Sequence, residues 1–376
     1  MAFVEATAAG EEVPLDQIET ELARLFVGRQ EPGEAGAVRR ARMSNLVIFG
    51  AGAERIAEAQ AAIPNIVAVH PARVLLAMHQ DQDEEGPVTG RVNAWCSVAS
   101  GTNHICCEQI TLTSHGRVGD HLVFAVRELI IGDLPTNLWW ASSTPPALAG
   151  PNLREAAEQT QQIIYDSNGW PDPARGVAAT AAWIAATERG HETGETWRVV
   201  SDVNWRRLKF WRRLIAQTLD PNAAPGALDS IAEVQIEHGP HAVVQAWLIV
   251  SWLASRLGWE VEEGKVQPGV EICWRARAPH GPLTIRIKRL ADGPADVRRL
   301  RIRCVMDGKP IGFSCSEVEP GRLAAVTEGI DTAPRTMTTQ PQPLDDLIAK
   351  QLSDRERDTV FRDALVVAER FARSVL

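Results

Sequence analysis

The feature that most constrains this chain is a strand–helix–strand pattern that begins at its first long apolar run. Residues 45–49 (NLVIF) are typical of a buried strand, Gly50-Ala-Gly52 of a turn, residues 54–62 of a helix and residues 73–78 of a second strand. This order predicts a parallel strand pair joined by a right-handed crossover.

Strands and helices continue to alternate as far as Leu219. Alternating apolar residues predict a hairpin across SVASGTNH, and the later strands are separated by helical periods. The expected strands cover 91–98, 105–113, 137–140, 162–166 and 197–201, and the expected helices cover 120–131, 174–188 and 204–219. The fold class is therefore α/β, with an N-terminal, mostly parallel α/β sheet domain that contains a hairpin.

The pattern changes after DPNAAPGALDS, a stretch rich in Pro, Gly and Ala that is typical of a boundary. One strand and a long apolar helix over 242–257 come first. Strands are then expected at 270–277, 283–289, 300–306, 311–318 and 323–327. Such segregation predicts a C-terminal α+β domain with an antiparallel sheet. TAPRTMTTQPQPLD is expected to be a loop, and residues 344–375 are expected to be helical.

These patterns divide the chain into three stretches. Residues 1–42 are expected to be an extension, with a short docking helix between Leu15 and Phe26 followed by a linker. Residues 43–225 are expected to form the α/β domain. Residues 226–376 are expected to form the α+β domain with its C-terminal helices.

Composition and charge exclude several classes of protein. The net charge of −9 argues against nucleic acid as a partner, because phosphate binding needs a basic surface. The most apolar stretch, residues 241–259, is interrupted by Gln245, Ser251 and Arg256, which argues against a membrane span. No export signal is expected at the N-terminus, so we expect a cytoplasmic protein with reduced thiols.

Searches for chemical motifs point away from catalysis. Gly50-Ala-Gly52 begins a dinucleotide fingerprint, but Arg55 occupies the third glycine position, and His70 lies where an acid should end the next strand. The sequence has no P-loop, HExxH or GxSxG motif, and its six cysteines form no CxxC pair. We therefore predict no catalytic residues, no cofactor and no metal site.

The predicted hairpin places two cysteines opposite each other. If it centres on Gly101, Cys96 faces Cys106 on an apolar surface where Glu108 is the misfit, and Cys107 points to the other face. Two interpretations stay open: a redox switch, or two small buried hydrophobic residues. Cys96, Cys106 and Cys107 are the redox candidates.

Three polar clusters that contain tryptophan end predicted strands: DLPTNLWW, YDSNGW and SDVNWRRL. Because the carboxyl ends of parallel strands share one edge, we expect these clusters to converge there. The alternatives are structural, since Asp202 could cap a helix and Trp205 has core-like spacing. The candidates for partner or ligand binding are Trp139, Trp140, Asp166, Ser167, Trp170, Asp202, Asn204, Arg207 and Trp211.

Together these segments resemble the glucose-6-phosphate dehydrogenase assembly protein family (OpcA). The resemblance rests on DLPTNLWWA, YDSNGW, SDVNWRRLKFWRRLIAQTLD, GRVNAWCSV and ICCEQITLTSHG, and it covers residues 42 to about 220. It implies a non-catalytic assembly factor and activator of glucose-6-phosphate dehydrogenase in the oxidative pentose phosphate pathway, with thioredoxin as a second partner. The alternative function is a sugar-phosphate- or nucleotide-binding enzyme or sensor that uses Asp166, Asp202 and Arg207.

Overall fold

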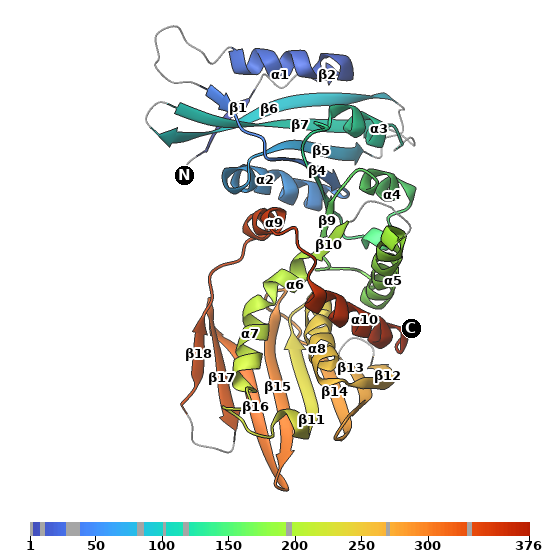
Figure 1. Ribbon diagram of the computed structural model, residues 1–376, viewed down its shortest axis with the longest axis vertical. Helices are drawn as coiled ribbons and strands as arrows, with labels where there is room; N and C mark the ends of the chain where they lie inside the picture. The colour runs from blue at the N-terminus through green and yellow to red at the C-terminus, as the bar shows by residue number, and fades with distance from the viewer. Residues whose placement is uncertain are drawn as a thin grey trace. The chain divides into compact units, whose positions relative to one another are not determined.

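The apolar run at residues 45–49 forms the central strand of the first sheet in the computed structural model (Figure 1). The structure describes residues 3–7, 12–27, 38–80, 86–100, 103–115, 120–192, 198–267, 271–328 and 333–376. The chain divides into two compact units. The first contains residues 1–166, 190–203 and 343–356, and the second contains residues 167–189, 204–342 and 357–376. The boundaries 42/43 and 225/226 expected from composition stay predictions.

The sheet of the first unit has the order β1-β6-β7-β5-β4-β8-β9-β10, and β2 and β3 pair with β6 and β7. Its described strands are β1 (Phe3–Thr7), β2 (Val13–Pro14), β3 (Val38–Arg40), β4 (Ser44–Gly50), β5 (Ala72–Gln80), β6 (Gly86–Ser100), β7 (Asn103–His115), β8 (Thr136–Ala141), β9 (Gln162–Tyr165) and β10 (Val199–Asp202). From β7 to β10 all neighbouring strands are parallel. Counted from β4, this is the 3-2-1-4-5-6 order of a doubly wound Rossmann sheet.

Helices cover both faces of this sheet. Apolar side chains of α2 (Ala53–Val69) and α9 (Leu344–Ser353) share a core with one face of β4, β5 and β8. The opposite face carries α1 (Ile18–Val27) and α3 (Asp120–Leu129), and Figure 1 shows α1 and α2 on opposite sides of the sheet. The short helix α4 (Pro151–Ala157) packs against α3.

The N-terminal extension contributes to this sheet. The docking helix expected between Leu15 and Phe26 is confirmed as the 3-10 helix η1 (Leu15–Gln17) followed by α1. The expectation of a linker is wrong for residues 38–40, because β3 pairs in parallel with β7 and Ala41 continues the ladder through its N–H. Residues 28–37 of that predicted linker lie outside the described residues.

The second unit is built on a separate, mostly antiparallel sheet with the order β12-β13-β14-β11-β15-β16-β17-β18. Its strands are β11 (Ile231–His238), β12 (Glu260–Gln267), β13 (Glu271–Ala278), β14 (Gly281–Arg289), β15 (Val297–Met306), β16 (Lys309–Glu319), β17 (Arg322–Glu328) and β18 (Arg335–Thr338). Only β11 and β14 pair in parallel among these described strands. The predicted antiparallel sheet is confirmed, but β18 lies within the stretch expected to be a loop.

Helices α7 (Lys209–Thr218), α8 (Val243–Leu257) and α10 (Thr359–Arg373) pack in the second unit, which also holds most of α5 (Pro173–Glu192). An aromatic chain links the sheet to two of these helices. The ring centroids of Trp247 and Trp274 lie 5.3 Å apart, and those of Trp274 and Phe371 lie 5.1 Å apart. Such pairs add to the stability that burial of the rings provides.

Two helices expected to be continuous are interrupted. The helix predicted over 204–219 forms α6 (Val203–Arg207) and α7, with Leu208 between them. The helix predicted over 344–375 forms α9 and α10, which belong to different units. The carboxylate of Asp358 accepts a hydrogen bond from the N–H of Phe361, so Asp358 is the N-cap at which α10 begins as a separate helix. Among the described helices, none combines the length and hydrophobicity needed to cross a membrane.

Candidate functional site

The three predicted polar clusters include residues at the carboxyl ends of neighbouring parallel strands. Trp140 on β8 is in register with Tyr165 on β9, and Tyr165 is in register with Asp202 on β10. The ends of these strands therefore lie side by side in the first unit, as the doubly wound topology requires. Asp166 and Asp202 are both buried there.

A second group of predicted residues meets within the second unit. The amide nitrogen of Asn204 donates to Ser167 Oγ at 2.9 Å, and the guanidinium of Arg207 donates to Asn204 Oδ1 at 2.8 Å. Ser167 and Asn204 are completely buried, so this chain of hydrogen bonds satisfies groups that would be costly to leave unpaired. Residues from two of the predicted clusters, YDSNGW and SDVNWRRL, thus form one connected polar group.

The predicted indoles lie inside the protein. Trp139 belongs to the apolar core under α2 and α9, and the Nε1 of Trp140 donates to the carbonyl of Thr144 at 2.8 Å. Trp170 and Trp211 are also buried, with 6% and 8% of their surface exposed. A partner would reach little of these rings directly, and their role in binding stays a prediction.

Sequence reasoning missed a polar–aromatic cluster around Trp205. The guanidinium of Arg212 lies 3.4 Å from the centre of the Trp205 ring, and Trp205 Nε1 donates to Asp358 at 2.6 Å. Burial lowers the pKa of Arg212 to about 10, against the opposing effect of Asp358. The spacing of Trp205 had indicated a core position, but nothing local could have indicated Asp358, which is 153 residues away.

The hairpin pairing predicted from the sequence is confirmed. Cys96 and Cys106 are register partners on β6 and β7, their Cα atoms are 4.0 Å apart, and they form a disulfide. The structure therefore differs from the expectation of reduced thiols for this pair. Both cysteines are buried, and Phe26 of α1 packs in the same cluster. We call this bond the hairpin disulfide.

Cys107 points to the other face, as predicted, and packs in the core with α2. Burial raises the pKa of its thiol to about 11, and the nearby Glu108 carboxylate acts in the same direction. Since the thiolate is the reactive form, this residue is poorly suited to redox chemistry at neutral pH.

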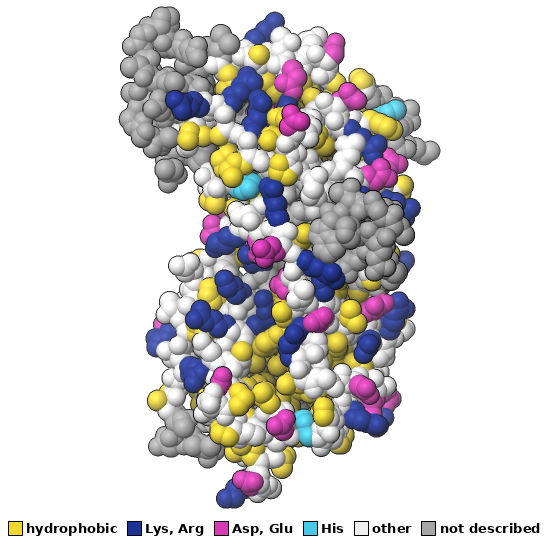
Figure 2. All heavy atoms as spheres, in the orientation of Figure 1, with side chains coloured by type: hydrophobic (Ala, Val, Ile, Leu, Met, Phe, Trp, Pro, Cys, Tyr) yellow, Lys and Arg dark blue, Asp and Glu magenta, His cyan; other side chains and the backbone are white. Residues whose placement is uncertain are grey.

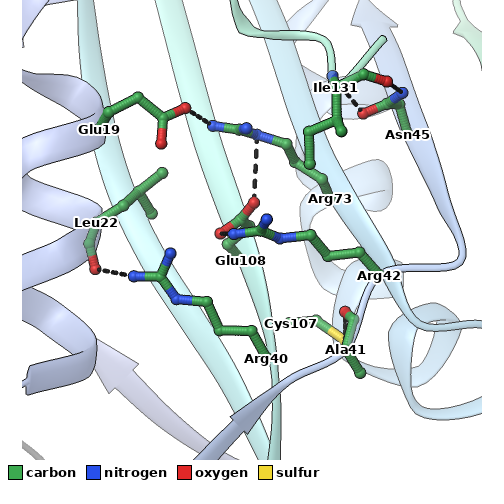
Figure 3. Close-up of polar contacts among 10 residues, drawn as sticks. All are labelled: Glu19, Leu22, Arg40, Ala41, Arg42, Asn45, Arg73, Cys107, Glu108 and Ile131. Carbon is green, nitrogen blue, oxygen red and sulfur yellow. Dashed lines mark hydrogen bonds and ion pairs between the residues drawn. The ribbon is translucent and has the colours of Figure 1, made fainter. Parts of the chain in front are cut away.

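Glu108, the misfit on the apolar hairpin face, is the centre of a buried charge cluster (Figure 3). Only 1% of its side chain is exposed, and its carboxylate lies 2.8 Å from Arg42 and 3.3 Å from Arg73. Arg73, itself 5% exposed, also pairs with Glu19 on α1. The cluster therefore joins β5, β7 and α1, and we call it the Glu108 cluster.

A third arginine fixes the other end of α1. Arg40 on β3 donates to the carbonyl of Leu22 at 3.0 Å, and its guanidinium lies 4.0 Å from the centre of the Phe26 ring (Figure 3 shows the first contact). Cation–π contacts of this kind stabilise by about 0.5–1 kcal/mol at exposed sites. Helix α1 is thus held over the hairpin disulfide by Arg40 and Arg73.

The turn after β4 does not fit a dinucleotide. Gly52 has a φ of 85° and precedes α2, so the expected strand-to-helix turn is confirmed. Arg55, at the position of the third glycine, is half-buried and pairs with Glu58 at 2.9 Å, where the fingerprint needs close packing of helix and strand. His70 is not on a strand but ends α2, with its ring 3.1 Å from Ser44 Oγ.

Family models match both halves of the chain. The model described as glucose-6-phosphate dehydrogenase subunit N-terminal domain matches residues 64–182, and the corresponding C-terminal domain model matches residues 198–365. The chain belongs to the glucose-6-phosphate dehydrogenase assembly protein family. The resemblance inferred from the tryptophan-containing segments is therefore confirmed, and it extends beyond residue 220.

Curated relatives of the same family come from cyanobacteria. The chain is 30% identical over 210 residues to the OxPP cycle protein OpcA of Synechocystis sp., and 32% identical over 214 residues to that of Nostoc punctiforme. These matches cover 54% and 56% of this chain but only 41% and 42% of the relatives. The matched region thus spans less than half the length of these relatives.

Solved structures share the fold at low sequence identity. A super-repressor mutant of Gal80p from Saccharomyces cerevisiae superposes with a TM-score of 0.50, at 10% identity, over 88% of this chain and 95% of that one. At this identity the likeness shows the fold alone.

Proposed function

We propose that this chain is a non-catalytic assembly factor and activator of glucose-6-phosphate dehydrogenase. The observation that carries the proposal is the match of both family models, which together take in residues 64–182 and 198–365. Arg55 in the dinucleotide fingerprint supports a role without nicotinamide chemistry. Ser167, Asn204 and Arg207 form hydrogen bonds with one another. These contacts support a structural role for the three residues, whereas the polar residues of an enzyme's active site point toward the substrate.

Activation follows from differential binding. A protein that binds the competent state of the dehydrogenase more tightly than the inactive state shifts the population toward the competent state. Each tenfold difference in affinity corresponds to about 1.4 kcal/mol. The nine predicted binding residues, Arg207 foremost because it is partly exposed, are the first positions to substitute.

The test is direct. Purified dehydrogenase is assayed with and without a molar excess of this chain, and its oligomeric state is followed by sedimentation velocity. We expect a higher rate at subsaturating glucose 6-phosphate and a shift toward the larger oligomer. Unchanged kinetics together with no detectable complex would refute the proposal.

We further propose that the hairpin disulfide makes this activation redox-responsive in the cytoplasm. A protein dithiol such as thioredoxin would transfer two electrons and two protons, so that the Cys96–Cys106 bond becomes two thiols and the donor becomes a disulfide. Both sulfurs are buried beneath Phe26, so this exchange requires local opening of α1 or of the hairpin.

Activation assays on the oxidised and reduced protein test the redox role. We expect a difference between the two forms, which the double variant Cys96→Ser/Cys106→Ser abolishes. Cys273→Ser, at a free and partly exposed cysteine, is the matched control and should retain the difference. Equal activation by the oxidised and reduced wild-type protein would exclude redox control through this bond.

A further inference from the structure

An open groove lies in the first unit between the N-terminal segment and α3. Its volume is about 870 Å³, and it is lined by parts of β2, η1, β6 and α3. The larger apolar residues of the lining are Val13, Pro14, Leu15, Pro87, Val88 and Phe124. Neither the Glu108 cluster nor the hairpin disulfide contributes a residue to this lining.

The groove exposes large apolar side chains to solvent. Phe124 is 55% exposed, although it is on a helix whose neighbouring residues Val123 and Ala125 are buried, and Leu15 is 36% exposed on the opposite wall. Exposed aromatic side chains beside a hollow are typical of protein contact surfaces. Burying both would remove apolar area from water, which favours a partner that fills the groove.

The titratable side chains that line the groove are mainly acidic, although the guanidinium of Arg127, outside the lining, lies 5.9 Å from the centre of the Phe124 ring. Glu12, Asp16 and Glu128 belong to the lining, whereas none of the described residues that line it is Lys or Arg. Arg91, outside the lining, pairs with Glu12 at 3.1 Å across exposed surface. Figure 2 shows hydrophobic side chains interspersed with acidic and basic ones on the face of the first unit that is turned to the viewer. The charge complement of this rim is a segment that carries Lys or Arg.

The shape favours a peptide segment over a small molecule. Sites for small ligands are concave and bury most of the ligand, whereas here Phe124 and Leu15 stand half in solvent on opposite walls. An amphipathic helix binds such a groove through apolar anchors spaced along one face, and its flanking charges meet the rim.

The described residues of a second copy do not offer that segment as a free helix. Its basic stretch at residues 206–213 spans the end of α6 and the start of α7, and Trp211, Leu214 and Ile215 of α7 are buried within its own unit. At a net charge of −9, two copies also repel each other at an acidic rim.

We infer that this groove binds an amphipathic segment of the dehydrogenase, with apolar anchors that cover Phe124 and Leu15 and with Lys or Arg beside Asp16 and Glu128. The inference rests on the proposed function, because it takes the dehydrogenase as the partner. It assigns the partner surface to α3 and η1, where none of the nine predicted binding residues is found.

Affinity measurements with purified dehydrogenase test the groove. Phe124→Glu, Leu15→Glu and the double reversal Asp16→Lys/Glu128→Lys are compared with wild type by biolayer interferometry. We expect each of the three to weaken binding by roughly thirtyfold or more, as at interface hot spots. Val366→Glu is the matched control, because Val366 is 52% exposed on α10 of the second unit, and its affinity should stay within twofold of wild type.

The outcomes separate the groove from the function. If the wild-type chain binds the dehydrogenase and all three groove variants bind with wild-type affinity, the groove inference is wrong and the proposed function stands. If the wild-type chain does not bind, the proposed function fails and the groove inference fails with it. Self-association of the wild type that Phe124→Glu abolishes would assign the groove to a second copy and also overturn the inference. Circular dichroism and thermal unfolding of each variant establish that it is folded.

Discussion

Neutralising Glu108 should destabilise the first unit strongly. The carboxylate is 1% exposed and neighbours two guanidinium groups, one of which, Arg73, is 5% exposed. In Glu108→Gln the ion-pair partner left to the buried Arg73 among the described residues is Glu19, which is exposed. Removing one member of a buried ion pair costs about 3–5 kcal/mol, because the remaining charge stays desolvated. For a unit of this size that corresponds to a fall in Tm of roughly 6–20 °C.

Differential scanning calorimetry measures this loss, and the chain offers a matched control. Glu319→Gln removes an exposed carboxylate that pairs with Arg322 at 2.9 Å, and it should cost less than about 1 kcal/mol. The double variant Glu108→Met/Arg73→Met should recover most of the lost stability, since apolar residues need no ion partner. A fall in Tm under 2 °C for Glu108→Gln would show that water reaches the cluster and would refute the reasoning.

Three further predictions concern other parts of the molecule. Phe26→Ala should speed reduction of the hairpin disulfide by dithiothreitol at least about tenfold, since it removes the cover that must open; an unchanged rate would contradict this. Burial, and next the nearby positive charge of an arginine, lower the pKa of His70 from 6.5. Its contribution to stability is therefore complete above pH 6.5 and is lost as pH falls toward the lowered pKa. In His70→Gln the free energy of unfolding should fall less steeply below pH 6.5 than in the wild type. The same pH dependence in both proteins would contradict this role of His70. Gly239→Ala would place a Cβ 1.9 Å from the Pro294 carbonyl oxygen, so it should cost about 1–3 kcal/mol or more by denaturant unfolding. Gly132→Ala meets nothing within 4 Å and should be neutral; equal effects would argue against a steric cause.

The central strands could be predicted because burial on both faces leaves an unbroken apolar run. Residues 45–49 are such a run, and β4 is buried along its whole length. Two strands of the second sheet, β12 and β18, were not predicted from the sequence. They are the two edge strands of that sheet. Edge strands are exposed and carry polar residues, so their sequences lack the alternation that reveals a half-buried strand.

Sequence reasoning found the misfit Glu108 but not its partners. Arg73 lies opposite Glu108 only because β5 and β7 are neighbours in the sheet, an order that local periodicity does not specify. The burial of the predicted indoles could not be recognised from the sequence for a related reason. Trp139 sits in a polar sequence context, yet its ring faces α2 and α9, and α9 comes from residues 344–353.

The same limit applies to function. Family motifs such as DLPTNLWW identified the family, while the groove between η1 and α3 combines residues about a hundred positions apart and carries no motif. Its acidic and apolar residues become a surface only when the β6–β7 hairpin places them together.

The most direct test of the account is the rate of purified glucose-6-phosphate dehydrogenase at subsaturating substrate, titrated with this chain. The account predicts a saturable rise in rate that tracks complex formation, and no oxidation of glucose 6-phosphate by the chain alone. A flat titration without a complex, or turnover by the chain without the dehydrogenase, would contradict it.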